Sequence, residues 1–453
     1  MARYIEYIPS IYSWLGDIPS HWEEKSIRQI TKVSSERLEN RNLPLLSVYR
    51  EYGVIPKKSR DDNHNVESSD LSNYKVVYKD NLVLNKMKMW QGSLGVSKYN
   101  GIVSPAYIVC KIVDESLNVR FLHFLLRTAK YKTYYNQYSY GIRVGQWDMH
   151  YEDLKNMKVY IPPRTEQEQI VRFLDWKVSE INKLIGIKQK KISRLTELQK
   201  AVINETVTHG LNKNAPMKFS GVEWIGNIPS HWQINKLKRV TTVRNEKGIY
   251  EPNITNRYIG LENVKSYSND IIVTLSEYDK SVQSICCKGD LMFSKLRPYL
   301  AKVIIAPYDS FCTGEMLIIS SFDGDMRFLR YLMLHESFIN SVDSSTYGAK
   351  MPRANPNYIL NMQLPIPQID EQREIANYID EKTLKIDNVV KKQLQIIAEL
   401  QELKSSLISD VVTGKIDVRN VEIPEYEHID DMVDDGDWEE NEEELADAEE
   451  TEA

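Results

Sequence analysis

The chain of 453 residues contains an internal duplication, and this feature restricts its possible folds more than any other. The stretch WLGDIPSHW at Trp14–Trp22 recurs as WIGNIPSHW at Trp224–Trp232, with seven of nine positions identical. Three further matches follow in the same order: Asn81–Met87 with Asp290–Leu296, Arg120–Leu122 with Arg327–Leu329, and Ile161–Gln167 with Ile366–Gln372. The offset between the copies drifts only from 210 to 205. Two homologous halves are therefore predicted.

Each half begins with a mixed globular domain. Short alternating runs at Tyr74–Tyr78, Asn81–Leu84 and Ala106–Val113 predict strands. A short helix is expected at Arg120–Ala129, with its counterpart at Arg327–His335. The class is therefore α+β, and residues 224–365 should repeat the same domain.

Each half ends in one long helix. A capping box at Thr165–Glu168 starts the first helix, which runs to Thr208 with Gly210 just beyond. The second starts at Asp370 and reaches Val412, followed by Gly414. At 1.5 Å per residue, each spans roughly 65 Å, far more than an ordinary globular helix.

Apolar residues at alternating steps of three and four predict a heptad seam on both helices. We expect the seam to contain Ile181, Leu184, Leu195, Leu198, Val202, Ile386, Val389, Ile396, Leu400, Leu403 and Leu407. Lysines interrupt the first helix, where Ile185 and Ile192 offer a shifted stripe. An antiparallel two-helix coiled coil between the two domains, with a pseudo-two-fold duplication, is the most economical arrangement. The alternative is that each helix packs on its own domain or on another chain.

The charge distribution is uneven. The formal net charge is −6, from 58 Lys and Arg against 64 Asp and Glu, but residues 422–453 hold 17 acidic residues and no Lys or Arg. Residues 1–421 therefore carry +11, which indicates a polyanionic partner.

The expected division of the chain is a first domain (1–163), first helix (164–210), second domain (211–367), second helix (368–414) and a C-terminal segment with an acidic, disordered tail (415–453).

The remaining patterns exclude several classes of protein. No apolar run approaches the ~20 residues of a membrane span, and the N-terminus lacks a signal-peptide core, so a cytoplasmic location is expected. The four cysteines have no metal-ligand spacing, which favours free thiols and no metal site. Phosphate loops and hydrolase motifs are absent from the sequence, so we expect no catalytic residues and no bound cofactor. The repeated His21 and His231 are interpreted as structural rather than catalytic.

Basic and amide side chains recur beside strand ends and tight turns in both halves. Such side chains read base edges and neutralise phosphates. The candidate DNA-binding residues are Lys86, Lys88, Gln91, Arg143, Gln146, Lys295, Arg297, Tyr299, Lys350 and Arg353. Their recurrence on a basic body favours nucleic acid over a merely solvated surface.

The duplicated Ile-Pro-Ser-His-Trp openings and the segments at Ile161–Gln167 and Ile366–Gln372, each leading into a long helix, resemble the specificity (S) subunits of type I restriction-modification systems. Thr413–Asp417 (TGKID) is also similar to that family's pattern. The resemblance covers about residues 12 to 420, and the acidic tail departs from it.

The resemblance implies a non-catalytic subunit of a bacterial or archaeal cell, with two target recognition domains that each read half of a bipartite site in double-stranded DNA. The helices would set the gap and dock two methyltransferase subunits, and restriction subunits would join the full complex. S-adenosylmethionine, ATP and Mg would belong to those partner subunits. Two other hypotheses stay open: a single-chain restriction or modification enzyme, and a coiled-coil scaffold without a DNA role.

Overall fold

The computed structural model describes residues 2–37, 43–50, 52–57, 71–141, 147–251, 257–272, 280–348 and 351–429. Its internal contacts divide the chain into two units. Unit 1 comprises residues 1–189 and 394–453, and unit 2 comprises residues 190–393. None of the described helices combines the length and the apolar run needed to cross a bilayer.

Unit 1 is built on an antiparallel four-stranded sheet in the order β4-β11-β8-β9. Its strands are Thr31–Ser34 (β4), Tyr107–Ile112 (β11), Leu82–Asn85 (β8) and Leu94–Val96 (β9). Four strand pairs surround it: Tyr7–Pro9 with Asp17–Pro19 (β1, β2), Glu23–Ser26 with Lys158–Ile161 (β3, β12), Leu46–Tyr49 with Gly53–Pro56 (β5, β6), and Lys75–Val77 with Gly101–Val103 (β7, β10). The short helices are Ile27–Ile30 (α1), Val119–Leu126 (α2), Ala129–Tyr138 (α3), Tyr151–Leu154 (α4) and the 3₁₀ helix Lys86–Gln91 (η2).

Unit 2 repeats this plan. Its sheet β16-β23-β20-β21 consists of Thr241–Val243, Met316–Phe322, Leu291–Ser294 and Val303–Ile305. A second sheet, β17-β19-β22-β18, consists of Lys247–Tyr250, Ser281–Cys286, Ser310–Cys312 and Tyr258–Ile259, with β18 parallel to β22. Two strand pairs are Met217–Phe219 with Asn227–Pro229 (β13, β14) and Gln233–Lys236 with Gln363–Ile366 (β15, β24). The short helices are Leu237–Val240 (α6), Met326–Met333 (α7), Glu336–Ser344 (α8), Pro356–Asn361 (α9) and Pro298–Leu300 (η3).

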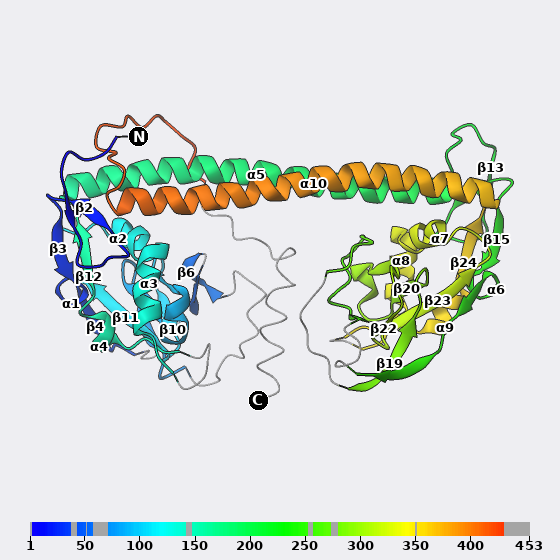
Figure 1. Ribbon diagram of the computed structural model, residues 1–453, viewed down its shortest axis with the longest axis horizontal. Helices are drawn as coiled ribbons and strands as arrows, with labels where there is room; N and C mark the ends of the chain where they lie inside the picture. Colours follow the sequence, from blue (N-terminus) through cyan, green and yellow to red (C-terminus); the bar gives the residue numbers. More distant parts are fainter. Residues whose placement is uncertain are drawn as a thin grey trace. The chain divides into compact units, whose positions relative to one another are not determined.

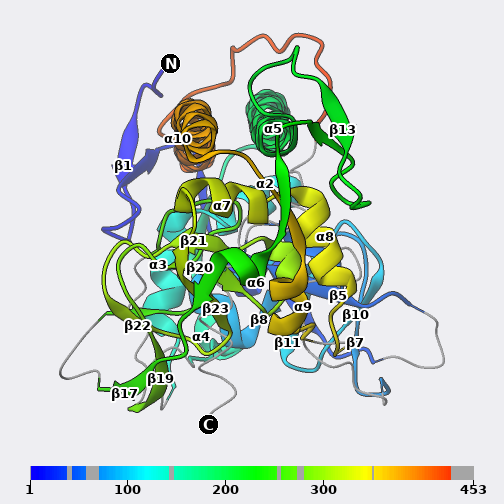
Figure 2. The same ribbon diagram turned by 90° about the vertical axis from the view of Figure 1, so that its right-hand side faces the viewer.

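The two long helices are Arg164–His209 (α5) and Ile369–Val412 (α10). They run side by side (Figures 1 and 2), and each contributes one part to each unit. In unit 1, Lys404 Nζ donates to Asn182 Oδ1 at 3.1 Å. In unit 2, Gln199 Nε2 donates to Asp387 Oδ1 at 3.4 Å. The residue numbers rise along one helix as they fall along the other, so the helices are antiparallel, and the predicted α+β duplication with paired long helices is confirmed.

The core of each unit joins its sheet to the ends of both long helices. In unit 1, Trp22 and Phe121 belong to one buried cluster with Leu174 of α5 and Val411 of α10. In unit 2, Trp232 and Phe328 belong to the corresponding cluster with Val207 and Ile375. Each domain therefore folds onto the start of one long helix and the end of the other.

The contacts between the long helices differ from the predicted heptad seam at several positions. Ile181 and Ile386 are buried, and Leu195, Val202, Ile396, Leu400 and Leu407 are half-buried. Four other predicted positions are exposed: Leu184 (46 %), Leu198 (51 %), Val389 (37 %) and Leu403 (55 %). Ile185, Ile192, Ile203 and Ile397 are buried on the shifted stripe instead. A straight helix drifts about 20° per heptad from a 3.5-residue repeat, which turns the neighbouring residue inward.

Candidate nucleic-acid interface and helix surfaces

In unit 1, the segment that begins at Lys86 contacts residues 147–149, which directly follow the predicted Arg143 and Gln146 in the sequence. The helix η2 follows β8 directly, and Met149 N–H donates to the Lys86 carbonyl at 3.0 Å. Lys86 Nζ pairs with Asp148 at 2.7 Å, and the rings of Trp90 and Trp147 meet edge to face with centroids 5.4 Å apart. Lys88 is exposed and Gln91 half-buried on η2, whereas Arg143 and Gln146 lie outside the described residues.

In unit 2, the corresponding segments meet in the same way after β20. Arg297 N–H donates to the Pro352 carbonyl at 2.8 Å, and Ala354 N–H donates to the Lys295 carbonyl at 2.8 Å. Arg353 pairs with Glu315 at 2.6 Å, and Tyr299 is exposed. Lys350 lies outside the described residues.

Two local features distinguish this surface in unit 2. Lys295 is partly withdrawn from solvent, which lowers the pKa of its ammonium group, and its Nζ donates to the Gly314 carbonyl at 2.8 Å. Arg297 adopts left-handed backbone angles, φ 47° and ψ 62°, which are costly for a residue with a Cβ. Backbone strain of this kind concentrates at functional sites.

The Glu-Gln pair that opens each long helix connects that helix to the domain, a role that the sequence interpretation missed. In unit 1, buried Glu166 bonds His21 Nε2 through Oε2 at 2.8 Å, while its Oε1 accepts from Trp22 Nε1 at 3.0 Å and Tyr4 OH at 2.7 Å. Burial is the largest cause of the raised pKa of the Tyr4 hydroxyl, and the hydrogen bond to the Glu166 carboxylate raises this pKa further. In unit 2, Glu371 Oε2 bonds His231 Nε2 at the same 2.8 Å. These contacts support the structural interpretation of both histidines.

The glutamine contacts are equally repeated. Gln167 Nε2 donates to the Pro162 carbonyl at 2.8 Å, and its Oε1 accepts the N–H of Asn118, the N-cap of α2, at 2.6 Å. Gln372 Nε2 donates to the Pro367 carbonyl at 2.8 Å, and its Oε1 accepts the N–H of Asp325, the N-cap of α7, at 2.9 Å. The same side chain therefore fixes the start of the same helix in both domains.

An arginine completes each connection. Arg120 of α2 forms two hydrogen bonds with Asp175 of α5, at 2.5 and 2.6 Å, and Arg327 of α7 pairs with Asp380 of α10 at 2.8 Å. We call the Glu, Gln and Asp of each long helix, with their His, N-cap and Arg partners, the junction of that unit.

The glycine that ends the opposite long helix also packs against each junction. Gly414 has a φ of +74°, and a Cβ there would lie 2.3 Å from Pro19 Cδ. Gly210 has a φ of +70°, and a Cβ there would lie 3.3 Å from the Trp232 ring. The Ile-Pro-Ser-His-Trp motif is therefore in contact with the start of one long helix and the end of the other.

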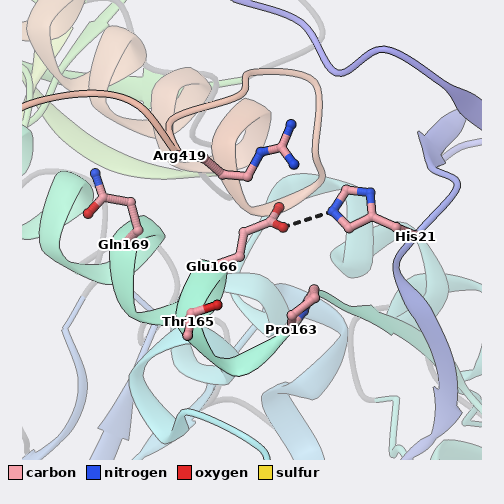
Figure 3. Close-up of a pocket in the computed structure, with 6 residues that line it drawn as sticks. All are labelled: His21, Pro163, Thr165, Glu166, Gln169 and Arg419. Atoms are coloured by element: carbon pink, nitrogen blue, oxygen red, sulfur yellow. Dashed lines mark hydrogen bonds and ion pairs between the residues drawn. The ribbon is translucent and has the colours of Figure 1, made fainter.

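The junction of unit 1 borders an open pocket of about 350 Å³. Figure 3 shows Glu166 pointing from α5 towards His21, with Arg419 on the facing segment. The lining residues are His21, Pro163, Thr165, Glu166, Gln169 and Arg419. Within the described ranges, no group of three or more His, Cys, Asp or Glu side chains is placed to hold a metal ion.

Replacing Glu166 with glutamine should destabilise unit 1 by about 1.5–3 kcal/mol, the usual contribution of hydrogen bonds to a charged group. The amide can keep its oxygen for Trp22 Nε1–H and Tyr4 OH, but these hydrogen bonds lose the charge of their acceptor, and an N–H2 group replaces the carboxylate oxygen that bonds His21 Nε2. Chemical denaturation followed by tryptophan fluorescence measures the change. Glu168→Gln is the matched control, because Glu168 is exposed and pairs only with Arg164. An equal loss in both variants would contradict the role of Glu166.

The four predicted seam residues that are exposed form two pairs related by the duplication. The offset of 205 relates Leu184 to Val389 and Leu198 to Leu403. Unit 1 holds Leu184 and Leu403, close to the Asn182–Lys404 hydrogen bond. Unit 2 holds Val389 and Leu198, close to the equivalent Asp387–Gln199 hydrogen bond. Each unit therefore contains one pair of exposed apolar residues, the docking pair, at equivalent positions of the two long helices.

Comparison with known proteins gives one consistent result. The family model "Type I restriction modification DNA specificity domain" matches residues 19–201 and 229–399, more than half of the chain. The chain is 24% identical over 431 residues to the type I restriction enzyme MjaVIII specificity subunit of Methanocaldococcus jannaschii, covering 89% of this chain and 95% of that protein. It is 22% identical over 354 residues to the type I restriction enzyme EcoDI specificity subunit of Escherichia coli, covering 72% and 76%.

A solved structure supports the fold. A chain from a study of complex assembly and conformational transition of the type I R-M system superposes with a TM-score of 0.58 at 14% identity. The match covers 88% of this chain and 99% of that one.

Proposed function

Because the chain belongs to the type I restriction-modification DNA specificity family, and is thus a non-catalytic specificity subunit, we propose how its two units divide the work. Each target recognition domain reads one half of a bipartite site in double-stranded DNA. The paired long helices fix the gap between the half-sites and carry two methyltransferase subunits. The observation that supports this most directly is that the basic loops, the junctions and the docking pairs all occur twice, at equivalent positions.

In unit 1 the DNA-reading surface includes the segment that follows β8, and in unit 2 it includes the segment that follows β20. Lys86, Lys88 and Gln91 contribute from η2, and Lys295, Arg297, Tyr299 and Arg353 contribute from unit 2. Arg143, Gln146 and Lys350 lie outside the described residues and are assigned to the same function from the sequence alone. Arg and Lys bind guanine edges and phosphates, and Gln binds adenine. The charge of +11 on residues 1–421 supplies the attraction that does not depend on sequence.

The partners follow from the family and from the docking pairs. Two copies of one methyltransferase subunit each cover one docking pair, and restriction subunits join the full complex. S-adenosylmethionine serves the methyltransferase subunits, and ATP and Mg serve the restriction subunits. Two equivalent apolar pairs suit two copies of one partner, because the same contact is then made twice.

Replacing Arg297 with alanine in the assembled complex should cost about 1–3 kcal/mol of DNA affinity and relax specificity at one position of one half-site. Binding to a panel of DNAs with single base-pair changes measures this. Arg239→Ala removes the same charge from exposed α6 and should leave the base preference unchanged. Uniform weakening across the panel would identify Arg297 as a phosphate contact and contradict base reading.

A further inference from the structure

The C-terminal segment beyond α10 breaks the pseudo-two-fold arrangement. Residues 415–429 run along the first part of α5 in unit 1. Gln169 Nε2 donates to the carbonyls of Val418 at 3.1 Å and Val421 at 2.8 Å. Val418 is buried in the core, and Val421 and Ile423 pack against it. The segment is therefore held by both polar and apolar contacts.

The last described residues of the segment reach the neighbourhood of the docking pair. Ile429 N–H donates to Ser179 Oγ at 3.2 Å, and its carbonyl accepts from Asn182 Nδ2 at 3.2 Å. Glu427 pairs with Lys183 at 3.2 Å. Asn182 also bonds Lys404, the neighbour of Leu403, and Lys183 directly precedes Leu184. The segment thus ends within one helical turn of the docking pair of unit 1.

Part of the equivalent face of α10 in unit 2 is exposed in the described structure, although Asp270 pairs there with Lys391 at 4.0 Å. Phe173 and Ser179 of α5 are each 2% exposed, whereas their counterparts Tyr378 and Leu384 are 36% and 61% exposed. The cause is the chain path: residues after Gly210 continue directly into β13 and the second domain, whereas residues after Gly414 have no further domain to enter in the described structure. One of two equivalent helix faces is therefore covered by the chain itself.

We propose that residues 421–429 make the two docking pairs unequal, so that the methyltransferase subunit binds more tightly at unit 2 than at unit 1. This inference rests on the docking proposed above. At unit 1 the partner must accommodate or displace the segment held on Ser179 and Asn182. At unit 2 the counterparts of Phe173 and Ser179, which are Tyr378 and Leu384, are exposed, and the partner has no described C-terminal segment to displace. The complex then assembles in a fixed order, with unit 2 occupied first.

Two single substitutions isolate the two positions. Leu403→Glu in unit 1 leaves only the docking pair of unit 2 intact, and Leu198→Glu in unit 2 leaves only that of unit 1. Titration of each full-length variant with purified methyltransferase subunit, by calorimetry or native mass spectrometry, gives one affinity per position. Because the partner at unit 1 gives up a few hydrogen bonds of the segment, we expect about tenfold weaker binding in Leu198→Glu.

Truncation assigns that difference to the segment. A stop after Asn420 in the Leu198→Glu background should tighten binding about tenfold, whereas the same stop in the Leu403→Glu background should change nothing. A stop after Ile429 keeps residues 421–429 and removes only the remaining acidic tail, so it should leave the difference in place. Ser179→Ala, which removes two hydrogen bonds with Ile429, should act in the same direction as the longer truncation, to a smaller extent.

Equal affinities in the two full-length variants would overturn the inference. A tenfold difference in affinity between the two variants that persisted after the stop at Asn420 and in the Ser179→Ala variant would overturn it as well. If the stop after Ile429 already removed the difference in affinity, residues 430–453 and not residues 421–429 would cause the asymmetry, and the inference would be wrong. Failure of the unsubstituted chain to bind the methyltransferase subunit at all would instead refute the proposed docking function.

Discussion

Replacing Leu198 and Leu403 together with glutamate should abolish DNA methylation by the assembled complex, while the chain itself still folds and binds DNA. Both side chains are more than half exposed, so the free chain tolerates a charge there. In the complex, each glutamate would be buried against a methyltransferase subunit without a partner, at about 2–5 kcal/mol per site. The measurement is adenine methylation mapped across a genome, together with co-purification of the methyltransferase subunit.

Ile187→Glu is the control for this experiment. Ile187 is 53% exposed on the same helix, but its counterpart on α10 is Lys392, so the equivalent position already carries a charge. Methylation by the Ile187→Glu variant should stay near the level of the unsubstituted chain. Normal methylation by the double variant would remove the docking pairs from the partner interface.

Lengthening both long helices by one heptad should increase the gap between the half-sites and leave the half-sites unchanged. Seven residues would be inserted after Gln189 in α5 and after Gln393 in α10, which preserves the antiparallel pairing. The added length is about 10 Å, at 1.5 Å per residue. At 3.4 Å per base pair, the gap should grow by up to about three base pairs. Methylome sequencing reports both the gap and the half-sites.

The matched control adds all fourteen residues after Asn212, in the loop between Gly210 and β13. This variant has the same chain length, but its helices are unchanged, so its gap should be unchanged. An altered half-site with an unaltered gap in the helix variant would refute the spacer role of the helices.

The duplication made the architecture predictable from sequence. The paired motifs gave the two domains and the two long helices, because prolines and glycines mark the ends of α5 and α10 in both copies. It also placed the basic clusters at equivalent positions, and the structure adds that they meet the same following segment in both units, through Met149 N–H to the Lys86 carbonyl and Ala354 N–H to the Lys295 carbonyl. The heptad pattern failed at Leu184 and Leu198, because a repeat of 3.5 residues does not determine which of two adjacent apolar residues faces the partner helix.

The junctions were missed because their partners are far apart in sequence. Arg120 and Asp175 are separated by 55 residues, and neither lies in an apolar pattern. A signal was nevertheless present: Glu, Gln, Asp and the helical Arg are identical in both halves, although most of the intervening sequence has diverged. The packing of Val418 and Ile423 on the first half of the chain had no such signal, because the duplication offers no second copy of that segment.

The junctions also bear on how such a protein changes over time. Every junction contact joins a residue of a long helix to a residue of the recognition domain. The domain supplies a histidine after Ile-Pro-Ser, the N-cap residue of α2 or α7, and an arginine two residues after that N-cap. None of them belongs to the loops after β8 and β20. A foreign domain with these three features would therefore pack on the resident helices. If each domain reads one half-site, as proposed above, recombination of the gene segment for one domain would replace one half of the recognised sequence in a single step.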